Sequence, residues 1–247
     1  MKHLTPKILV IGDSCTDIFI YGNIKRICPE APVPVFNPTH QTENGGMARN
    51  VKNNLEALGC DVDIITNPND IKKIRYVDSR SNQIVLRVDE HDYCEPVNSY
   101  YLDFDENKYD AIIISDYCKG FLSEENMQYL CNYKNVFIDT KRQIGKWINN
   151  VDFIKINELE YEKNQEFLNK SLYNSKLIVT LGSKGCKYID DLFPVKEVSA
   201  RDVSGAGDTF LAGLVTEYVK SNDIRKSIRF AQECTIKVVQ KAGVETI

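Results

Sequence analysis

The sequence lacks several features that would each point to a special class of protein. Its eight cysteines form no C-x-x-C pair and its three histidines are not grouped with them, so neither a zinc site nor a disulfide framework is expected. It has no dense run of lysine or arginine and a formal net charge of −4, which argues against a nucleic-acid partner. The first apolar run, Ile8 to Ile11, is too short for a signal-peptide core or a membrane span. We therefore expect a cytoplasmic protein with reduced thiols and no membrane partner.

The composition is that of an ordinary globular protein. Hydrophobic residues make up 43% and charged residues 27% of the 247 residues. This length fits one large α/β domain that buries a full core without disulfides. We therefore treat residues 1–247 as a single domain.

Short apolar runs alternate with segments of helical spacing. The runs predict strands at 8–11, 62–65, 84–88, 111–114, 136–138, 153–156 and 177–179, of which 84–88 would be an edge strand. Helices are predicted at 47–58, 123–131, 159–168, 206–220 and 224–241. Strands that alternate with helices indicate a mostly parallel sheet covered on both faces, which is an α/β fold. Residues 17–36 differ, because aromatic and β-branched residues mixed with prolines are typical of the edge strands of a small second sheet.

Polar residues follow many of the predicted core strands. The strand ends carry Asp13, Ser115-Asp116, Asp139, Asn157 and Thr180. In a parallel sheet the carboxyl ends of the strands lie on one edge, where open α/β folds bind their ligands. Each residue taken alone could equally cap the next helix, but the whole set favours a ligand crevice.

The segment Asp202-Val203-Ser204-Gly205-Ala206-Gly207-Asp208-Thr209-Phe210 carries the strongest chemical signal. Its small residues allow a ligand to approach the backbone, and the helix that follows directs unpaired amides and its dipole at the same space. Asp208 stands in the first turn of that helix, beside this anion site. It is therefore a candidate base for phosphoryl transfer to a hydroxyl, with the amides of Ala206 and Gly207 stabilising the phosphoryl oxygens. The alternative is a helix start with an acidic residue and no further function.

The same segment resembles the C-terminal signature of the ribokinase-like (PfkB) carbohydrate kinases. Gly12-Asp13 with Asp17 resembles the sugar-binding opening of that family, and Gly45-Gly46 with Asn50 resembles its second glycine motif. Three further segments are similar to the kinase domain of the bacterial heptose 7-phosphate kinases: 21–35, which includes Arg26-Ile27-Cys28-Pro29-Glu30-Ala31-Pro32-Val33-Pro34-Val35, Ser115-Asp116-Tyr117-Cys118-Lys119-Gly120, and Ile138-Asp139-Thr140-Lys141. The resemblance covers most of the chain, with its motifs in the family's order.

The resemblance implies a ribokinase-like three-layer α/β/α sandwich with a small β-lid, whose strands are inserted around 17–37 and 74–90. It implies ATP as co-substrate, Mg²⁺ as cofactor, and a monovalent cation as a further candidate. Asp208 would be the base, with Gly205, Ala206 and Gly207 as the anion hole. The sugar would be held by Asp13, Asp17, Gly45, Gly46, Asn50 and Asp116, and Arg80 and Arg87 would meet a phosphate on the substrate unless they are solvated surface arginines. The nucleotide side would comprise Asn157, Glu160, Thr180, Gly182, Gly185 and Ser204, with Asn157 and Glu160 organising Mg²⁺ partly through water.

The sequence also departs from the family pattern. The stretch between Val62 and Ile74 is much shorter than usual, so we expect one peripheral layer to be missing. The spacing from Gly45-Gly46 to Asn50 is one residue longer than usual, and Ser204 replaces a threonine. No nucleotidyltransferase domain is expected after Ile247, which would set the chain apart from the two-domain form.

The implied activity is ATP-dependent phosphorylation of the anomeric hydroxyl of a heptose 7-phosphate. Two alternatives stay open: a kinase of the same fold that acts on another sugar, sugar phosphate or nucleoside, and a relative that binds sugar or nucleotide without catalysis. The lid would cover the sugar, exclude water and, because exposed strand edges tend to pair, join two subunits into a homodimer.

Overall fold

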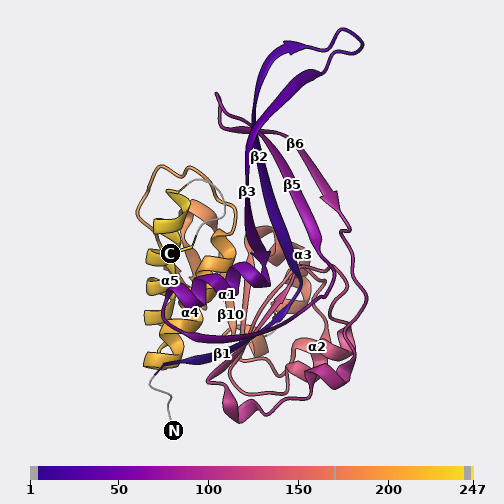
Figure 1. Ribbon diagram of the computed structural model, residues 1–247. Coiled ribbons are helices and arrows are strands. Elements are labelled where there is room, and N and C mark those ends of the chain that lie inside the picture. The colour runs from indigo at the N-terminus through magenta and orange to yellow at the C-terminus, as the bar shows by residue number, and fades with distance from the viewer. Residues whose placement is uncertain (1–4, 170, 242–245) are drawn as a thin grey trace.

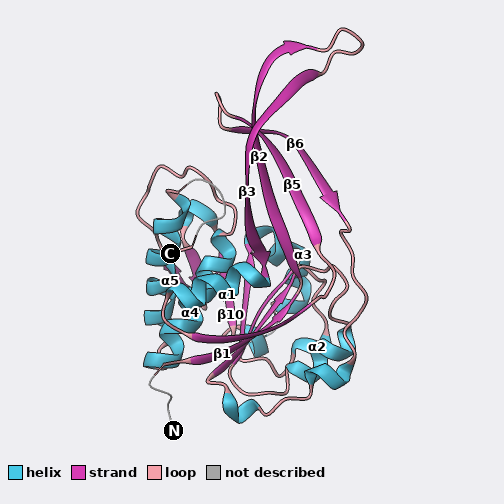
Figure 2. Cartoon of the chain, in the orientation of Figure 1, coloured by secondary structure: helices cyan, strands magenta, loops and turns pink. Residues whose placement is uncertain are grey.

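The computed structural model describes residues 5–169, 171–241 and 246–247 of the chain, and its centre is an eight-stranded sheet (Figures 1 and 2). The strand order is β12-β11-β10-β9-β8-β7-β1-β4. All neighbours pair in parallel except β10 with β11 and β11 with β12, which are antiparallel. The strands are β1 (Lys7–Gly12), β4 (Asp61–Thr66), β7 (Ala111–Asp116), β8 (Val136–Thr140), β9 (Phe153–Asn157), β10 (Leu177–Thr180), β11 (Cys186–Tyr188) and β12 (Asp191–Phe193).

Helices cover both faces of this sheet. The α-helices are α1 (Ala48–Ala57), α2 (Glu124–Leu130), α3 (Glu158–Leu168), α4 (Ala206–Ser221) and α5 (Ile224–Val239), and short 3₁₀ helices lie at Ser99–Leu102, Glu106–Lys108, Lys146–Ile148, Ser171–Tyr173 and Gly182–Lys184. Alternate residues of β1 point to opposite faces: Ile8 and Val10 pack with α1, α4 and α5, whereas Leu9 and Ile11 pack with the layer that contains α2 and α3. The predicted three-layer α/β/α sandwich is therefore confirmed.

Four further strands form a second sheet, the predicted lid, that rises from the carboxyl edge of the first (Figure 1). Its order is β3-β2-β5-β6, from β2 (Ser14–Ile27), β3 (Pro34–Met47), β5 (Ile71–Asp78) and β6 (Gln83–Glu90). β2 and β3 are longer than the apolar pattern suggested. Their distal halves form an exposed ribbon, and since its side chains do not enter a core, the sequence shows no apolar pattern there. The ribbon returns the chain to its starting point, since Ser14 pairs with Met47 and the N–H of Ala48 donates to the carbonyl of Asp13 (2.9 Å).

The connection between the two sheets is short, as the sequence indicated. After β4 only Asn67 to Asp70 separate the main sheet from β5, and β4 is the edge strand of the main sheet. Asn67 secures this crossing, since its side chain accepts from the N–H of Ser14 (2.7 Å) and donates to the Ser14 carbonyl (3.1 Å).

All eight cysteines are free, and all except Cys28 and Cys118 are buried. Among the residues described, no helix combines the length and the apolar character that crossing a membrane requires.

Candidate active site

Asp208 lies at the centre of the carboxyl edge of the main sheet, in the first turn of α4. It is only 3% exposed, and both of its carboxylate oxygens accept hydrogen bonds. The hydroxyl of Tyr117 donates to Oδ1 (2.6 Å) and the amide of Asn50 donates to Oδ2 (2.9 Å). Burial raises the pKa of Asp208 to about 6, although these two hydrogen bonds act in the opposite direction. The result is a carboxylate that is ionised at neutral pH and still able to take up a proton.

The backbone before Asp208 carries the amides that the sequence predicted to form an anion hole. Gly205 has φ 77°, a left-handed conformation that suits glycine and turns the chain into α4. The N–H of Ala206 donates to the carbonyl of Val203 (3.2 Å), so this amide is already engaged. The N–H groups of Gly207 and Asp208 have no hydrogen-bond acceptor among the described residues. The amides open to a ligand are thus those of Gly207 and Asp208, one residue further along than expected from the sequence, while Ser204 donates its N–H to Asp202 (2.8 Å).

A buried ion pair lies directly beneath Gly207. Lys155 and Asp139, which are cross-strand neighbours on β9 and β8, are paired at 2.5 Å and both are nearly inaccessible. A Cβ at position 207 would stand 2.9 Å from Nζ of Lys155, so glycine there lets the ammonium group reach the anion hole. Burial alone would raise the pKa of Asp139, but the ammonium groups of Lys155 and Lys141 outweigh it and lower that pKa.

Tyr117 connects Asp208 to the cations around it. Its ring lies 5.4 Å from Nζ of Lys73 and 5.4 Å from Nζ of Lys141, measured to the ring centroid. Burial raises the pKa of Tyr117 well above its ordinary range, and the carboxylates of Asp208 and Asp139 add to this rise. Tyr117 is therefore a neutral hydrogen-bond donor to Asp208.

Asp13 and Asp116, two of the predicted sugar residues, lie at the ends of β1 and β7 and hold the segments that follow β7 and end β8. The carboxylate of Asp13 accepts from the backbone N–H groups of Tyr117 (2.7 Å), Lys119 (3.2 Å) and Phe121 (3.2 Å). Burial raises the pKa of Asp13 although these bonds oppose the rise. Asp116 accepts from the hydroxyl of Thr140 (2.6 Å) and from Arg142 (3.2 Å). Asp116 also accepts from the backbone N–H of Cys118 (3.2 Å), so both carboxylates shape the loop that carries Tyr117, and direct contact with a sugar stays a prediction for each.

The lid brings Asp17 and the glycine motif to the same place. Asp17 is buried and accepts from Arg75 (2.6 Å) on the neighbouring strand β5. A Cβ at Gly46 would lie 2.1 Å from Oδ2 of Asp17, so the close approach requires glycine there. Gly45 lies one residue before it, where a Cβ would stand 2.9 Å from Cβ of Arg49. Asn50 reaches Asp208 despite the longer spacing of its motif.

Asn157 and Glu160 cap helix α3 reciprocally. The Asn157 side chain accepts from the N–H of Glu160 (2.9 Å), and the Glu160 carboxylate accepts from the N–H of Asn157 (2.8 Å) and pairs with Lys141. Within the described ranges no three His, Cys, Asp or Glu side chains are grouped to hold a metal ion. Asn157 and Glu160 nevertheless offer an amide oxygen and a carboxylate, which fits an Mg²⁺ ion that is held mainly by phosphate oxygens and water.

A cavity of about 310 Å³ lies on the other side of the α4 N-terminus. Its walls include Thr180, Gly182 and Gly185 on one side and Ala206 and Gly207 on the other, and apolar residues of α5 close it. Gly182 and Gly185 have positive φ values of 58° and 99°. Three of the six predicted nucleotide residues, Thr180, Gly182 and Gly185, therefore line an apolar cavity, whereas Asn157, Glu160 and Ser204 are not among its lining residues.

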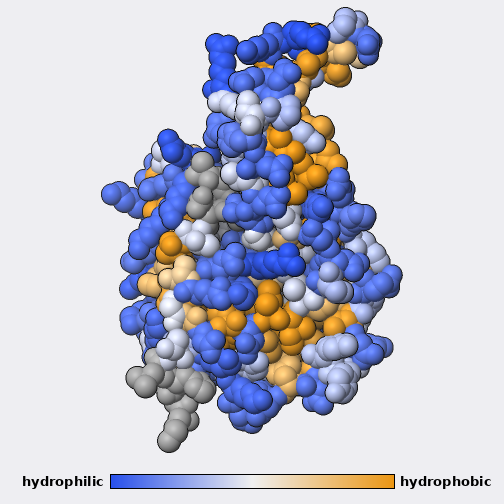
Figure 3. All heavy atoms as spheres, in the orientation of Figure 1, coloured by the Kyte–Doolittle hydropathy of each residue, from blue (hydrophilic) through white to orange (hydrophobic). Residues whose placement is uncertain are grey.

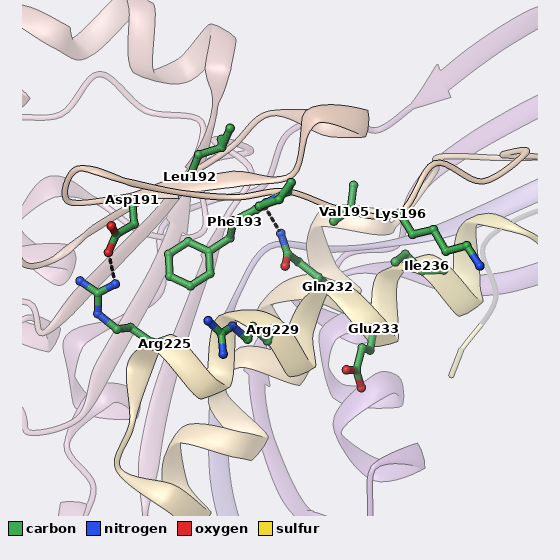
Figure 4. Close-up of a pocket in the computed structure, with 11 residues that line it drawn as sticks. Asp191, Leu192, Phe193, Val195, Lys196, Arg225, Arg229, Gln232, Glu233 and Ile236 are labelled. Carbon is green, nitrogen blue, oxygen red and sulfur yellow. Dashed lines mark hydrogen bonds and ion pairs between the residues drawn. The ribbon is translucent and has the colours of Figure 1, made fainter.

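A larger hollow, of about 590 Å³, lies between β12 and α5 (Figure 4). Gln232 donates to the carbonyl of Phe193 (2.6 Å) in its wall, and Arg225 pairs with Asp191. It contains none of the residues that surround Asp208, so its size does not make it the reaction site.

The two predicted arginines lie apart. Arg80 is exposed in the turn between β5 and β6, whereas Arg87 lies on β6, where Arg75 is its cross-strand neighbour. Arg87 holds Asp89 with two nitrogens, each at 2.7 Å. The structure brings Arg87 to the inner face of the lid and leaves Arg80 outside it.

Sequence reasoning assigned no role to Tyr117, Lys141, Lys155, Lys73 or Arg75. Two signals were available for some of them. Tyr117 and Lys141 directly follow polar strand ends, and Lys155 is a charged residue inside the apolar run 153–156. Lys73 and Arg75 alternate with apolar residues on β5, a pattern that an exposed strand face would also give.

Known structures share this architecture. Ribokinase from Thermotoga maritima matches with a TM-score of 0.70 and 16% identity over 96% of this chain and 94% of that one. Arabidopsis thaliana ribokinase, solved in complex with ribose and ATP, matches with a TM-score of 0.68 and 15% identity over 97% and 94%. The fold is thus that of the ribokinase-like kinases.

The sequence places the chain within that class. Residues 117–247 match the pfkB family carbohydrate kinase pattern, which is more than half of the chain, and the chain belongs to this family. It is accordingly a sugar kinase, a phosphotransferase that acts on a hydroxyl group.

Two proteins named "Bifunctional protein HldE" are similar along the whole chain. The protein from Sulfurimonas denitrificans is 30% identical over 303 aligned positions and that from Nitratiruptor sp. 31% over 296, covering 100% and 98% of this chain. The chain spans 63% of the length of each relative. Since 303 positions exceed the 247 residues of the chain, the relatives contain segments that this chain lacks within the matched region.

Proposed function

We propose that the chain transfers the γ-phosphate of ATP to the anomeric hydroxyl of a heptose 7-phosphate, giving the 1,7-bisphosphate, with Asp208 as general base. The observation that carries this proposal is the buried carboxylate of Asp208 beside the unengaged amides of Gly207 and Asp208 itself. A base and an anion hole at one point are what in-line transfer to a hydroxyl requires.

Asp208 can accept a further hydrogen bond from an acceptor hydroxyl. A carboxylate offers about four lone-pair positions, and Tyr117 and Asn50 use one each. With a pKa of about 6 the group is ionised at neutral pH and accepts a proton readily. In the transfer, the acceptor oxygen bonds to the γ-phosphorus, the bond from that phosphorus to ADP breaks, and the hydroxyl proton passes to Asp208.

The surrounding charges suit the phosphate side of the reaction. The free amides stabilise negative charge on the transferring group, and the Lys155 ammonium lies against Gly207 to add to this effect. Mg²⁺ would offset charge on the phosphates when bound, and Glu160 with Asn157 would hold it through water. A monovalent cation stays a prediction without assigned residues.

The heptose acceptor is supported by the relatives. HldE proteins contain a kinase domain that is a heptose 7-phosphate kinase, and about 30% identity extends along the whole of this chain. The three segments that resemble the heptose kinases lie at the lid ribbon, at the loop that carries Tyr117 and at the loop that carries Lys141. Two of these loops surround the proposed acceptor position.

The test is ADP release with ATP, Mg²⁺ and a panel of acceptors. The panel contains D-glycero-D-manno-heptose 7-phosphate, the same heptose without phosphate, fructose 6-phosphate, ribose and adenosine. Turnover confined to the heptose phosphate, with a new anomeric phosphate in the phosphorus NMR spectrum, supports the proposal. Turnover only with another acceptor would make the chain a kinase of the same fold that acts on that acceptor. Binding without ADP release would make it a relative that binds sugar or nucleotide without catalysis.

Asp208→Asn tests the base. We expect kcat to fall by at least about 100-fold, because proton transfer by a positioned group contributes this much, while the Kd of ATP stays within about twofold. Asp190→Asn, at an exposed turn, is the matched control and should retain full activity. Undiminished turnover in Asp208→Asn would show that Asp208 is not the general base.

We also propose that two copies associate through the lid. Three consecutive apolar residues of the edge strand β6 are exposed, Ile84 by 51%, Val85 by 41% and Leu86 by 54%, and Figure 3 shows hydrophobic surface along the lid. Such an edge favours pairing with another strand. Sedimentation should show a dimer that Leu86→Lys disrupts, and a wild-type monomer at micromolar concentration would refute it.

A reducing compartment that supplies ATP, the cytoplasm, is our proposed location. Its support is the eight free thiols, most of them buried. Fractionation of cells with an antibody against the chain would test it.

A further inference from the structure

The inner face of the lid carries a group of charged side chains at the base of the sheet. Lys73 and Arg75 point inward from β5, and their cross-strand neighbours are Asp17 and Phe19 on β2 and Asp89 and Arg87 on β6. Three cations therefore face two carboxylates.

Each carboxylate is already bound by an arginine. Asp17 accepts from Arg75 at 2.6 Å, and Asp89 is held by both nitrogens of Arg87 at 2.7 Å. Lys73 is the cation left over: it is 8% exposed, and among the described residues no carboxylate lies within ion-pair distance of its ammonium group. Its ammonium group lies over the ring of Tyr117, 5.4 Å from the ring centroid.

The Lys73 side chain is mostly buried and its ammonium group has no anion nearby, which the contact with an aromatic ring offsets only in part. An anion that arrives with a ligand would complete the site. Lys73 shares its side of the lid with Asp17 and Gly46, and Tyr117 separates it from Asp208. The nucleotide cavity lies beyond the start of α4 and includes no residue of the lid. The ligand anion therefore belongs to the acceptor.

We propose that Lys73, with Arg75 and Arg87 beside it, forms the subsite for a phosphate ester on the acceptor sugar, so that the enzyme selects phosphorylated over neutral acceptors. This inference rests on the proposed sugar-phosphate kinase activity and identifies the residue that recognises the substrate's own phosphate. An acceptor seated there places its phosphate at Lys73 and its reacting hydroxyl at Asp208, on either side of Tyr117. Arg80, in the hairpin turn, has no part in this subsite.

The test compares Lys73→Met with Lys73→Arg and with a matched control, Lys72→Met. Lys72 is the adjacent residue of β5 and is 38% exposed on its side chain, on the opposite face. Kinetics are measured with the heptose 7-phosphate, with the same heptose lacking phosphate, and with ATP as the varied substrate. Thermal unfolding and ATP binding of each variant show that it is folded.

We expect Lys73→Met to raise KM for the heptose 7-phosphate about 10- to 100-fold, as the loss of a charge-assisted hydrogen bond implies. KM for ATP, turnover at saturation and kcat/KM for the neutral heptose should each stay within about twofold. Lys73→Arg should retain most of the affinity and Lys72→Met all of it.

Other outcomes separate the two proposals. A rise only in KM for ATP would assign Lys73 to the nucleotide, and a fall in kcat shared by both heptoses would mean that it acts through Tyr117 on Asp208; either result overturns the subsite and leaves the heptose activity intact. If the wild-type enzyme ignores heptose 7-phosphate but uses fructose 6-phosphate in a Lys73-dependent way, the heptose assignment fails and the subsite stands. A preference for neutral acceptors would overturn both.

Discussion

Tyr117→Phe removes one hydroxyl from the site and thereby tests what sets the pKa of Asp208. The hydroxyl donates to Oδ1 of Asp208 at 2.6 Å inside the protein, and it is one of two hydrogen bonds that hold the pKa of this buried carboxyl at about 6. A hydrogen bond to the charged form lowers a pKa, so its loss raises the pKa of Asp208. Hydrogen bonds to charged groups contribute about 1.5–3 kcal/mol, which corresponds to a rise of about one to two pH units.

The rate should follow this rise. At pH 7 about 90% of Asp208 is ionised in the wild-type enzyme, given a pKa of about 6. In the variant the ionised fraction would be about 10–50%, so kcat/KM falls about two- to tenfold at pH 7 and returns close to the wild-type value at pH 9. The pH profile of kcat/KM, measured with one acceptor from pH 5 to 9, reports the difference in the pKa of Asp208 between the two enzymes. Ionisation of the acceptor's own phosphate affects both profiles equally and does not contribute to this difference.

Tyr109→Phe is the matched control, since Tyr109 also donates to a carboxylate, Asp63, at 2.9 Å, but at the surface away from the site. Its profile should coincide with that of the wild-type enzyme. A loss in Tyr117→Phe that is equally large at every pH would refute the reasoning, because Tyr117 would then act by packing or by touching the substrate rather than through the ionisation of Asp208.

Three further changes probe other parts of the site. Lys155→Met leaves Asp139 buried without its closest partner and should lower the free energy of unfolding by about 3–5 kcal/mol in urea titrations; a loss under 1 kcal/mol would show that Lys141 alone compensates Asp139. Gly46→Ala places a methyl group 2.1 Å from Oδ2 of Asp17 and should raise the acceptor KM at least about tenfold while the ATP KM stays constant, and equal effects on both would argue against a local role. Ala200→Trp, at the exposed rim of the 310 Å³ cavity, should raise the ATP KM at least about fivefold with an unchanged melting temperature; an unchanged ATP KM would place the nucleotide elsewhere.

The main sheet was predictable because its parallel strands are buried on both faces. Strands such as Ala111–Asp116 then appear as continuous apolar runs, and each ends in a polar residue that the structure places at one edge. The antiparallel strands Cys186–Tyr188 and Asp191–Phe193 were not predicted, because three residues are too few for a period to show. The outer halves of β2 and β3 were also missed, since an exposed ribbon has no buried face to produce a pattern.

The site could be predicted only where the signal is local in sequence. The small residues before Asp208 predict an anion site within a few positions of it, and this identified the candidate base. The groups that adjust the base come from far away: Tyr117 lies 91 positions from Asp208 and Asn50 lies 158 positions from it. No local spacing encodes such contacts, because the order of strands in the sheet creates them. Whether Lys73 has a counter-ion likewise depends on which strand lies next to β5.

Because the base of the lid ribbon is closed, the same two strands can hold the site in place at one end and vary freely at the other. Ser14 pairs with Met47 and the carbonyl of Asp13 receives the N–H of Ala48, so the chain leaves and re-enters the main domain at one fixed point. Everything between these anchors forms one loop whose length barely alters the entropic cost of closing it. The far end of the ribbon can therefore be shortened, extended or exchanged with that of another kinase while Asn50 keeps its position against Asp208. Changes can therefore accumulate at the tip without disturbing the catalytic centre.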